Sequence, residues 1–279
     1  MARDLFSPVG ILDETHGAVT RTAGPWLGVL WLCTIPYRLA QVYFIHEILS
    51  LGVAAPQYSG HLESLALVVF ALLLLAVFGR AVYVRACLLA LQSGSGAGRE
   101  AFRVPAAHLV NSIYGALVCE VLFAMTVWMF VSVPVLAAPT GLVYVAALRT
   151  ERPGLVRPLL EIGRLMAGVR AMSGLLSTFA VAMPIAFVNF YVALRLGLWA
   201  ASSLGGDSMA RWTHLLRPIH PMFEILPGEP LTALICTAGA LLIIEPFWLA
   251  ALTVYVHRTR LRQSGEDLRL RFRVLTGAR

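Results

Sequence analysis

The chain has 279 residues, of which 58 % are hydrophobic and only 13 % are charged, and its formal net charge is +7. This composition excludes an ordinary soluble domain, because such domains carry about 25 % charged residues. All 22 basic residues are arginine, and the absence of lysine also excludes a Walker A phosphate loop and a pyridoxal-phosphate Schiff base.

Six apolar stretches predict an all-α fold, a polytopic transmembrane helical bundle. A hydrocarbon core about 30 Å thick needs about 20 apolar helical residues to cross, and continuous apolar runs favour helices over a barrel. We place the spans at 26–49, 62–91, 109–131, 133–150, 172–199 and 231–256. The chain is thus predicted to be a single integral membrane domain at 1–279, with cytoplasmic segment 1–25, spans within 26–256 and basic tail 257–279.

The N-terminal segment predicts a helix along the inner headgroup layer. Ser7-Pro8 resembles a helix start, with serine as the cap and proline at the first helical position, ahead of Ile11, Leu12, Thr15 and Val19. Acidic residues precede the first apolar run, so no cleavable signal peptide is expected.

Two further segments, Arg99–His108 and Pro153–Arg170, occupy the corresponding places before the second and third predicted hairpins. Each fits either an amphipathic helix at the interface or a solvated connector. The stretch Ser93–Gly98 predicts a flexible linker. It matches neither G-x-G-x-x-G nor G-x-S-x-G and follows a membrane span, so it does not predict a phosphate-binding loop.

The third and fourth spans have two interpretations. The apolar run from Leu109 to Leu148 is too long for one crossing and is interrupted by Pro134, Pro139 and Gly141. These breaks favour a tight hairpin, so that three helical hairpins make up the bundle. The alternative is a single tilted helix followed by a re-entrant segment.

Arginine orients the spans by the positive-inside rule. Most arginines lie within 80–103, 149–170 and 258–279, after the second, fourth and sixth spans. The loops at 52–60 and 134–139 contain no arginine, and the loop after the fifth span contains only Arg211 and Arg217. Both termini are therefore predicted to be cytoplasmic, in a bacterial inner membrane. The net charge is interpreted as membrane topology and attraction to anionic lipid, and no nucleic-acid partner is predicted.

Three ionisable residues are predicted near the middle of their spans: Arg38, Glu120 and Glu245. Such residues are costly at the bilayer centre unless they are paired or hydrated, so they are candidates for function. Pro36 and Pro246 lie beside two of them and break helical hydrogen bonds, which exposes polar backbone at mid-membrane in transporters. A buried Arg–Glu pair can instead fix how helices pack.

Other polar residues predict less chemistry. Asn111 and Asn189 are expected to tie helices together by hydrogen bonds. The four cysteines lie in apolar spans without a CxxC pair, and the histidines follow no known ligand spacing, so no metal and no cofactor are predicted. We expect Arg258, Arg260 and Arg262, just after the last span, to contact lipid headgroups.

The two ends of the chain carry a family resemblance. Arg260-x-Arg262-x-x-Gly265-x-Asp267-Leu268 resembles the ending of bacterial multi-pass proteins similar to the membrane domain of glycerophosphoryl diester phosphodiesterases. Gly10–Glu14 resembles the opening G-x-I-L-D motif of that family, and Glu151–Gly154 its central segment; Arg258 and Ser264 depart from the tail pattern. The resemblance implies a six-helix membrane module without catalytic activity, since the catalytic barrel of those enzymes is a separate soluble domain.

The sequence therefore predicts a non-enzymatic membrane component, an accessory or scaffold protein that associates with membrane lipids and with membrane-protein partners or further copies of itself. The alternative is a transporter-like protein that uses Arg38, Glu120 and Glu245. The second alternative is a membrane enzyme that acts on lipid headgroups.

Overall fold

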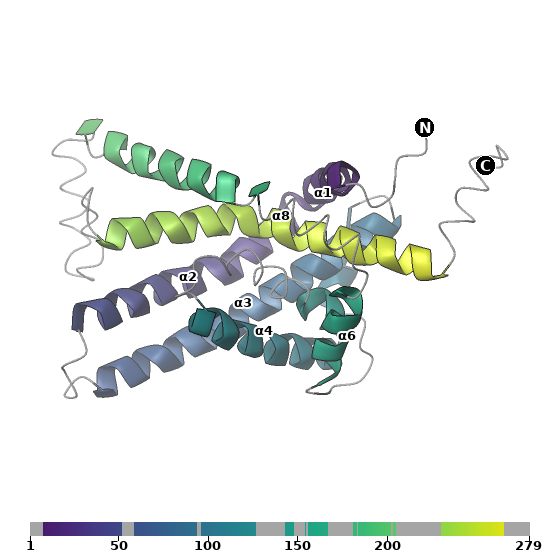
Figure 1. Ribbon diagram of the computed structural model, residues 1–279, viewed down its shortest axis with the longest axis horizontal. Coiled ribbons are helices and arrows are strands. Elements are labelled where there is room, and N and C mark those ends of the chain that lie inside the picture. Colours follow the sequence, from purple (N-terminus) through teal and green to yellow (C-terminus); the bar gives the residue numbers. More distant parts are fainter. Residues whose placement is uncertain are drawn as a thin grey trace. The chain divides into compact units, whose positions relative to one another are not determined.

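The computed structural model describes residues 8–51, 59–93, 96–126, 143–147, 154, 156–166, 181–182, 184–201, 203–204 and 230–264, and these residues include no strand (Figure 1). The labelled elements are α1 (Pro8–Thr22), α2 (Pro25–Leu51), α3 (Ser59–Ser93), the 3-10 helix η2 (Arg99–Phe102), α4 (Ala106–Thr126), α6 (Arg157–Met166) and α8 (Pro230–Ser264). Residues 143–147, 181–182, 184–201 and 203–204 are also helical.

Among the described residues, four helices are long and apolar enough to cross a membrane: Pro25–Ile48, Gly60–Ser93, Pro184–Ala201 and Thr232–Thr259. They coincide with the first, second and sixth predicted spans and with the later part of the fifth. α4 covers most of the predicted third span. The predicted fourth span lies outside the described residues except for the helical piece at 143–147.

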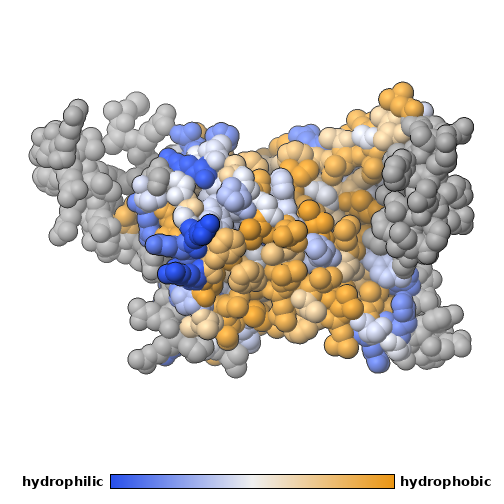
Figure 2. Space-filling view, turned by 180° about the vertical axis from the view of Figure 1, so that it is seen from behind, coloured by the Kyte–Doolittle hydropathy of each residue, from blue (hydrophilic) through white to orange (hydrophobic). Residues whose placement is uncertain are grey.

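The surface of the helices is largely apolar. Figure 2 shows hydrophobic side chains covering much of the described surface on one face of the protein. On α3, Leu67 is 70 % exposed and Val68 is 51 % exposed, and on α2 Leu32 is 75 % exposed. Large apolar side chains that are exposed along helices of membrane-spanning length indicate that lipid surrounds these helices.

The helices form two compact units. The first contains 1–30, 80–181 and 246–279, and the second contains 31–79 and 182–245. The helices α2, α3 and α8 contribute residues to both units. The packing of each unit is therefore described separately.

The first unit is built around α1 and the adjoining parts of α3 and α8. α1 is described from Pro8, and Ser7, the predicted cap, lies outside the described residues. The helix buries Ile11, Thr15 and Val19, which lie four residues apart on one face, whereas Leu12 is 41 % exposed. The three buried residues pack in a core whose largest fully buried side chains include Tyr83 and Tyr255. The helical face predicted for the N-terminal segment is thus used for packing within the protein.

The turn from α1 to α2 depends on Gly24. Its φ of +93° lies in the left-handed region, where a side chain is strained, and Pro25 then starts α2. The N–H of Gly28 donates to the carbonyl oxygen of Gly24 at 2.9 Å, which closes the first turn of α2. The glycine–proline pair thus ends one helix and begins the next.

We expect Gly24→Ala to lower the free energy of unfolding in detergent by about 1 kcal/mol, because alanine must adopt the left-handed conformation. The matched control is Gly28→Ala, where a Cβ would meet nothing within 4 Å. Alanine is the better helix former, so the control is expected to be neutral or slightly stabilising. Thermal unfolding of both variants checks this, and equal effects would contradict it.

The second unit joins parts of α2 and α8 with the helix at 184–201. Val42 of α2 packs against Ala238, and the indole N–H of Trp31 donates to the carbonyl oxygen of Leu242 at 3.1 Å. A Cβ added at Gly239 would lie 2.9 Å from Leu194 Cδ1, so the absence of a side chain lets helix 184–201 approach α8 closely. Small residues at such crossings are typical of membrane helices.

Candidate functional site

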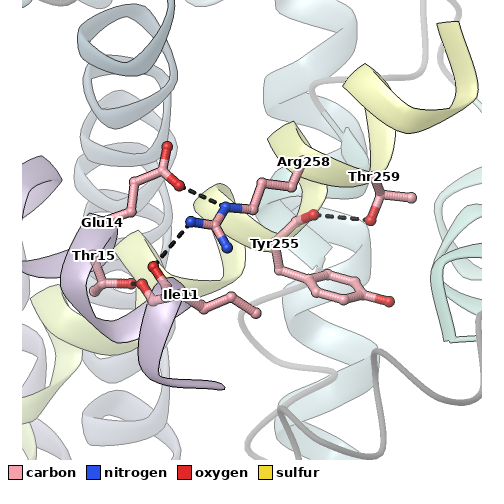
Figure 3. Close-up of polar contacts among 7 residues, drawn as sticks. Ile11, Glu14, Thr15, Tyr255, Arg258 and Thr259 are labelled. Atoms are coloured by element: carbon pink, nitrogen blue, oxygen red, sulfur yellow. Dashed lines mark hydrogen bonds and ion pairs between the residues drawn. The ribbon is translucent and has the colours of Figure 1, made fainter. Parts of the chain in front are cut away.

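The best-defined polar contact of the first unit joins the two ends of the chain. Arg258 on α8 donates from Nε to Glu14 Oε2 of α1 at 2.6 Å, and its Nη2 donates to the carbonyl oxygen of Gly10 at 2.9 Å (Figure 3). The Arg258 side chain is only 11 % exposed, against 34 % for Glu14. The guanidinium therefore bridges a carboxylate and a backbone carbonyl of the same short helix. We call this contact the α1–α8 clamp.

Threonine hydroxyls of the same two helices bond within their own helix. Thr15 donates to the carbonyl oxygen of Ile11 at 2.6 Å, and Thr259 donates to that of Tyr255 at 2.9 Å (Figure 3). A hydroxyl that bonds to its own preceding turn needs no partner from another helix. Arg258 thus provides the charged connection between α1 and α8.

The clamp changes the interpretation of the predicted headgroup-binding residues. Sequence predicted lipid contact for Arg258, Arg260 and Arg262, whereas the Arg258 guanidinium lies on Glu14 and Gly10. Arg260 and Arg262 lie on α8, but their side chains are outside the described part of the structure. Lipid contact by these two residues stays a prediction.

The second unit brings together two of the three predicted mid-membrane charges. Arg38 Nη2 lies 4.0 Å from Glu245 Oε2, and the two side chains are 17 % and 10 % exposed. Arg38 Nη1 donates to Gln41 Oε1 at 2.8 Å, and its Cζ lies 5.5 Å from the centroid of the Tyr37 ring. The arginine is therefore held by a carboxylate, an amide and an aromatic ring.

Glu120 lies on α4, in the other unit, and its side chain is outside the described residues. The predicted cluster of three is thus described only as the pair of Arg38 and Glu245. This pair connects α2 to α8 beside Pro36 and Pro246, and both helices continue through these prolines. The pair is suited to holding α2 and α8 in place, because the Arg38 guanidinium contacts both the Glu245 carboxylate and the Gln41 amide oxygen.

Arg80 is a buried charge that sequence reasoning missed. It is 5 % exposed, and its Nη1 donates to the hydroxyl of Tyr144 at 3.2 Å, with Cζ 6.0 Å from the centroid of that ring. From its sequence, Arg80 was counted only among the cytoplasmic arginines. The signal that could have found it was its position inside the predicted span 62–91.

Asn111 was predicted to tie helices together, but the hydrogen bond in the structure joins α4 to Gly154, which lies outside the helices. It is 1 % exposed, and its Oδ1 accepts a hydrogen bond from the backbone N–H of Gly154 at 3.1 Å. Gly154 precedes α6, which packs against α4. The Asn111 side chain therefore holds the backbone three residues before α6 begins.

His108 stands at the start of α4, outside the predicted span. Burial, followed by the nearby Arg85, lowers its pKa from the ordinary value of 6.5. Its Nδ1 is buried and has no hydrogen-bond partner among the described residues. The neutral imidazole is therefore the form that the folded protein accommodates.

We expect the detergent-solubilised protein to lose thermal stability as the pH falls below 6.5 toward the lower pKa of folded His108. In this window the unfolded chain binds more protons than the folded chain, so protonation favours unfolding. Melting temperatures measured between pH 7.5 and 5 check this. His108→Gln should show a smaller decrease over the same range, and an equal decrease would contradict the assignment.

Metal binding has no support from the geometry, since the described residues include no group of three or more His, Cys, Asp or Glu side chains that could hold an ion. A comparison with known protein families, with curated proteins and with solved structures finds no match. A function is therefore inferred from the residues of this chain alone.

Proposed function

We propose that the chain is a non-enzymatic, multi-pass component of the bacterial inner membrane that acts as an accessory or scaffold subunit. In this proposal it crosses the membrane six times and keeps both termini in the cytoplasm. The one-sided distribution of arginine and the four apolar helices of spanning length support this topology. The resemblance of the chain ends to a membrane domain without catalytic residues agrees with it.

The helix at 184–201 carries the functional part of the proposal. It is a candidate span, yet none of its apolar window is buried inside the described structure. Val192 is 45 % exposed and Leu196 is 59 % exposed. A membrane helix open on most sides either faces lipid or receives a helix from a partner.

Asn189 favours a partner. It is exposed in the first half of the apolar helix 184–201, and its side chain forms no hydrogen bond to any described residue. An amide in hydrocarbon gains free energy by bonding to another helix, by about 0.6–2 kcal/mol. Asn111, the residue of the same type on α4, has such a partner within the chain.

Arg195 follows Val192 by three residues on the same helix. Its Nη1 donates to the hydroxyl of Tyr191 at 2.8 Å, and its guanidinium lies over that ring. Its long side chain can also reach the outer headgroups, so Asn189 is the stronger support for a partner helix.

Photo-crosslinking in native membranes tests this proposal. A photoreactive residue at Val192, which lies between Asn189 and Arg195, is expected to give a protein adduct of defined mass. The control position is Leu67 on α3, which is more exposed, at 70 %, and has no asparagine or arginine within four residues along the helix. Absence of a protein adduct at Val192, or the same adducts at both positions, would contradict the proposed interface.

Transport is the second candidate, and the specific observation in its favour is the pair of Arg38 and Glu245 beside Pro36 and Pro246. It requires Glu245 to exchange its arginine for a proton or a substrate group. The Glu245 carboxylate, the Gln41 amide and the Tyr37 ring around Arg38 favour a fixed pair instead, and the Glu245 variants distinguish the two roles.

A further inference from the structure

A cleft of about 600 Å³ lies where α3 ends and the chain turns toward η2. Leu89, Gln92 and Ser93 of the last turn of α3 form one wall, and the backbone of 96–98 with Arg99, Glu100 and Arg103 forms the other. The volume falls within the range of small-molecule sites, about 300–1,000 Å³. The glycine-rich stretch, which by its sequence predicted only a flexible linker, thus forms part of the wall of a concave site.

Two observations favour a position of this cleft near the lipid headgroups. The candidate membrane span of α3 ends at Ser93, which itself lines the cleft. The indole N–H of Trp26 donates to the carbonyl oxygen of Ala97 at 3.1 Å, and its ring lies 4.9 Å from that of Phe102. Tryptophan is enriched at the boundary between hydrocarbon and headgroups. The arginine distribution assigns this end of α3 to the cytoplasmic side.

The charged side chains of the cleft are available to a ligand. Arg99, Glu100 and Arg103 are exposed, and among the described residues none of their side chains forms an ion pair or a hydrogen bond. Arg85 Nε and the N–H of Arg103 both donate to the backbone carbonyl of Glu100, at 3.2 and 3.1 Å, and leave its carboxylate unused. Two guanidinium groups and one carboxylate therefore line one cleft without neutralising each other.

We propose that this cleft binds a phosphoethanolamine headgroup. Arg99 and Arg103 bind the phosphate, for which the planar guanidinium is well suited. Glu100 binds the ammonium group, and the last carbonyls of α3, at the negative end of the helix dipole, favour a cation at the same place. This site goes beyond the proposed scaffold role and does not involve the helix at 184–201.

Glu100 distinguishes this ligand from other phosphates. A wholly anionic headgroup such as phosphoglycerol gains nothing from the carboxylate and is repelled by it. A choline headgroup carries the same charges but has no N–H to donate to Glu100. The chemistry is shared by membrane phosphatidylethanolamine and by free phosphoethanolamine, so the test includes both.

Native mass spectrometry of the full-length protein, titrated with phosphatidylethanolamine, phosphatidylglycerol or phosphatidylcholine, tests the site. We expect phosphatidylethanolamine to bind at least about 10-fold more tightly than the other two. R99Q/R103Q should lower its affinity at least about 10-fold, whereas E100Q should remove the preference over phosphatidylglycerol. The matched control R164Q changes an arginine on α6 that is 80 % exposed and should have no effect.

Competition with free phosphoethanolamine shows whether the site recognises the headgroup alone or the intact lipid phosphatidylethanolamine. Competition by the free compound would assign recognition to the headgroup alone, and binding of the lipid without competition would assign it to the intact lipid. Equal binding of all three lipids, or a preference that survives both R99Q/R103Q and E100Q in variants with the parental melting temperature, would overturn the site. Neither result would affect a protein adduct at Val192, so failure of this site and failure of the scaffold role are distinguishable.

Discussion

Arg258→Gln is expected to lower the free energy of unfolding by about 2 kcal/mol. The substitution removes a guanidinium that is 11 % exposed and leaves the Glu14 carboxylate and the Gly10 carbonyl without their donor. Hydrogen bonds to charged groups contribute about 1.5–3 kcal/mol when they are sheltered from water. Thermal or denaturant unfolding of the detergent-solubilised protein measures the change, and amide exchange should increase in α1.

The matched control is Arg164→Gln. Arg164 lies 3.7 Å from Glu161 on the same helix turn and is 80 % exposed, so the loss of its ion pair should cost less than about 0.5 kcal/mol. If both variants unfold alike, or if α1 exchanges as slowly in Arg258→Gln as in the parent, the clamp does not stabilise the first unit.

Glu245→Gln is expected to destabilise the protein by about 2–3 kcal/mol, because Arg38 keeps its charge in an apolar surrounding and loses its carboxylate. Replacing both residues, in Arg38→Met/Glu245→Leu, should recover most of the loss, since two apolar side chains leave no charge uncompensated. Melting temperatures of Arg38→Met, Glu245→Leu and the double variant complete a double-mutant cycle, which measures the coupling between the two residues.

Glu63→Gln on α3 is the matched control for this cycle, because its carboxylate is exposed and has no ion pair among the described residues. Recovery of stability in the double variant would assign the pair to helix packing. A Glu245→Gln protein as stable as the parent would remove the packing role and favour transport.

The sequence predicted the parts of the fold that depend on local hydropathy. Apolar runs located the helices α2, α3 and α8. Such signals need no knowledge of neighbouring helices, because lipid is the common solvent. The apolar run from 109 to 148 contains proline and glycine breaks, which fit either a helical hairpin or one helix with a re-entrant segment. About half of this run lies outside the described residues.

The polar contacts could not be predicted in the same way. Glu14 and Arg258 are 244 residues apart, and their pairing depends on how two helices are rotated about their axes. Arg80 illustrates the same limit: counted by its charge, it belonged to a cytoplasmic cluster, but the position of Tyr144 makes it a buried donor. Arg38 and Glu245 were found because a charge in an apolar run is itself a local signal.

Asn111 and Asn189 show why residue type alone does not define a function. Both were expected to tie helices together, and Asn111 bonds to Gly154 within the chain. Asn189 is exposed on a helix of spanning length and forms no hydrogen bond to the described residues. The difference lies in what surrounds each amide, and it is the basis of the proposed partner interface.

Native mass spectrometry of the parent protein and of Asn189→Leu, released from mild detergent, tests the scaffold role most directly. The account predicts that the parent is a defined complex, either with further copies of itself or with a second membrane protein. It also predicts that Asn189→Leu, which should fold normally, shifts this complex toward the free chain. A parent protein that is monomeric, with no protein bound, would contradict the account.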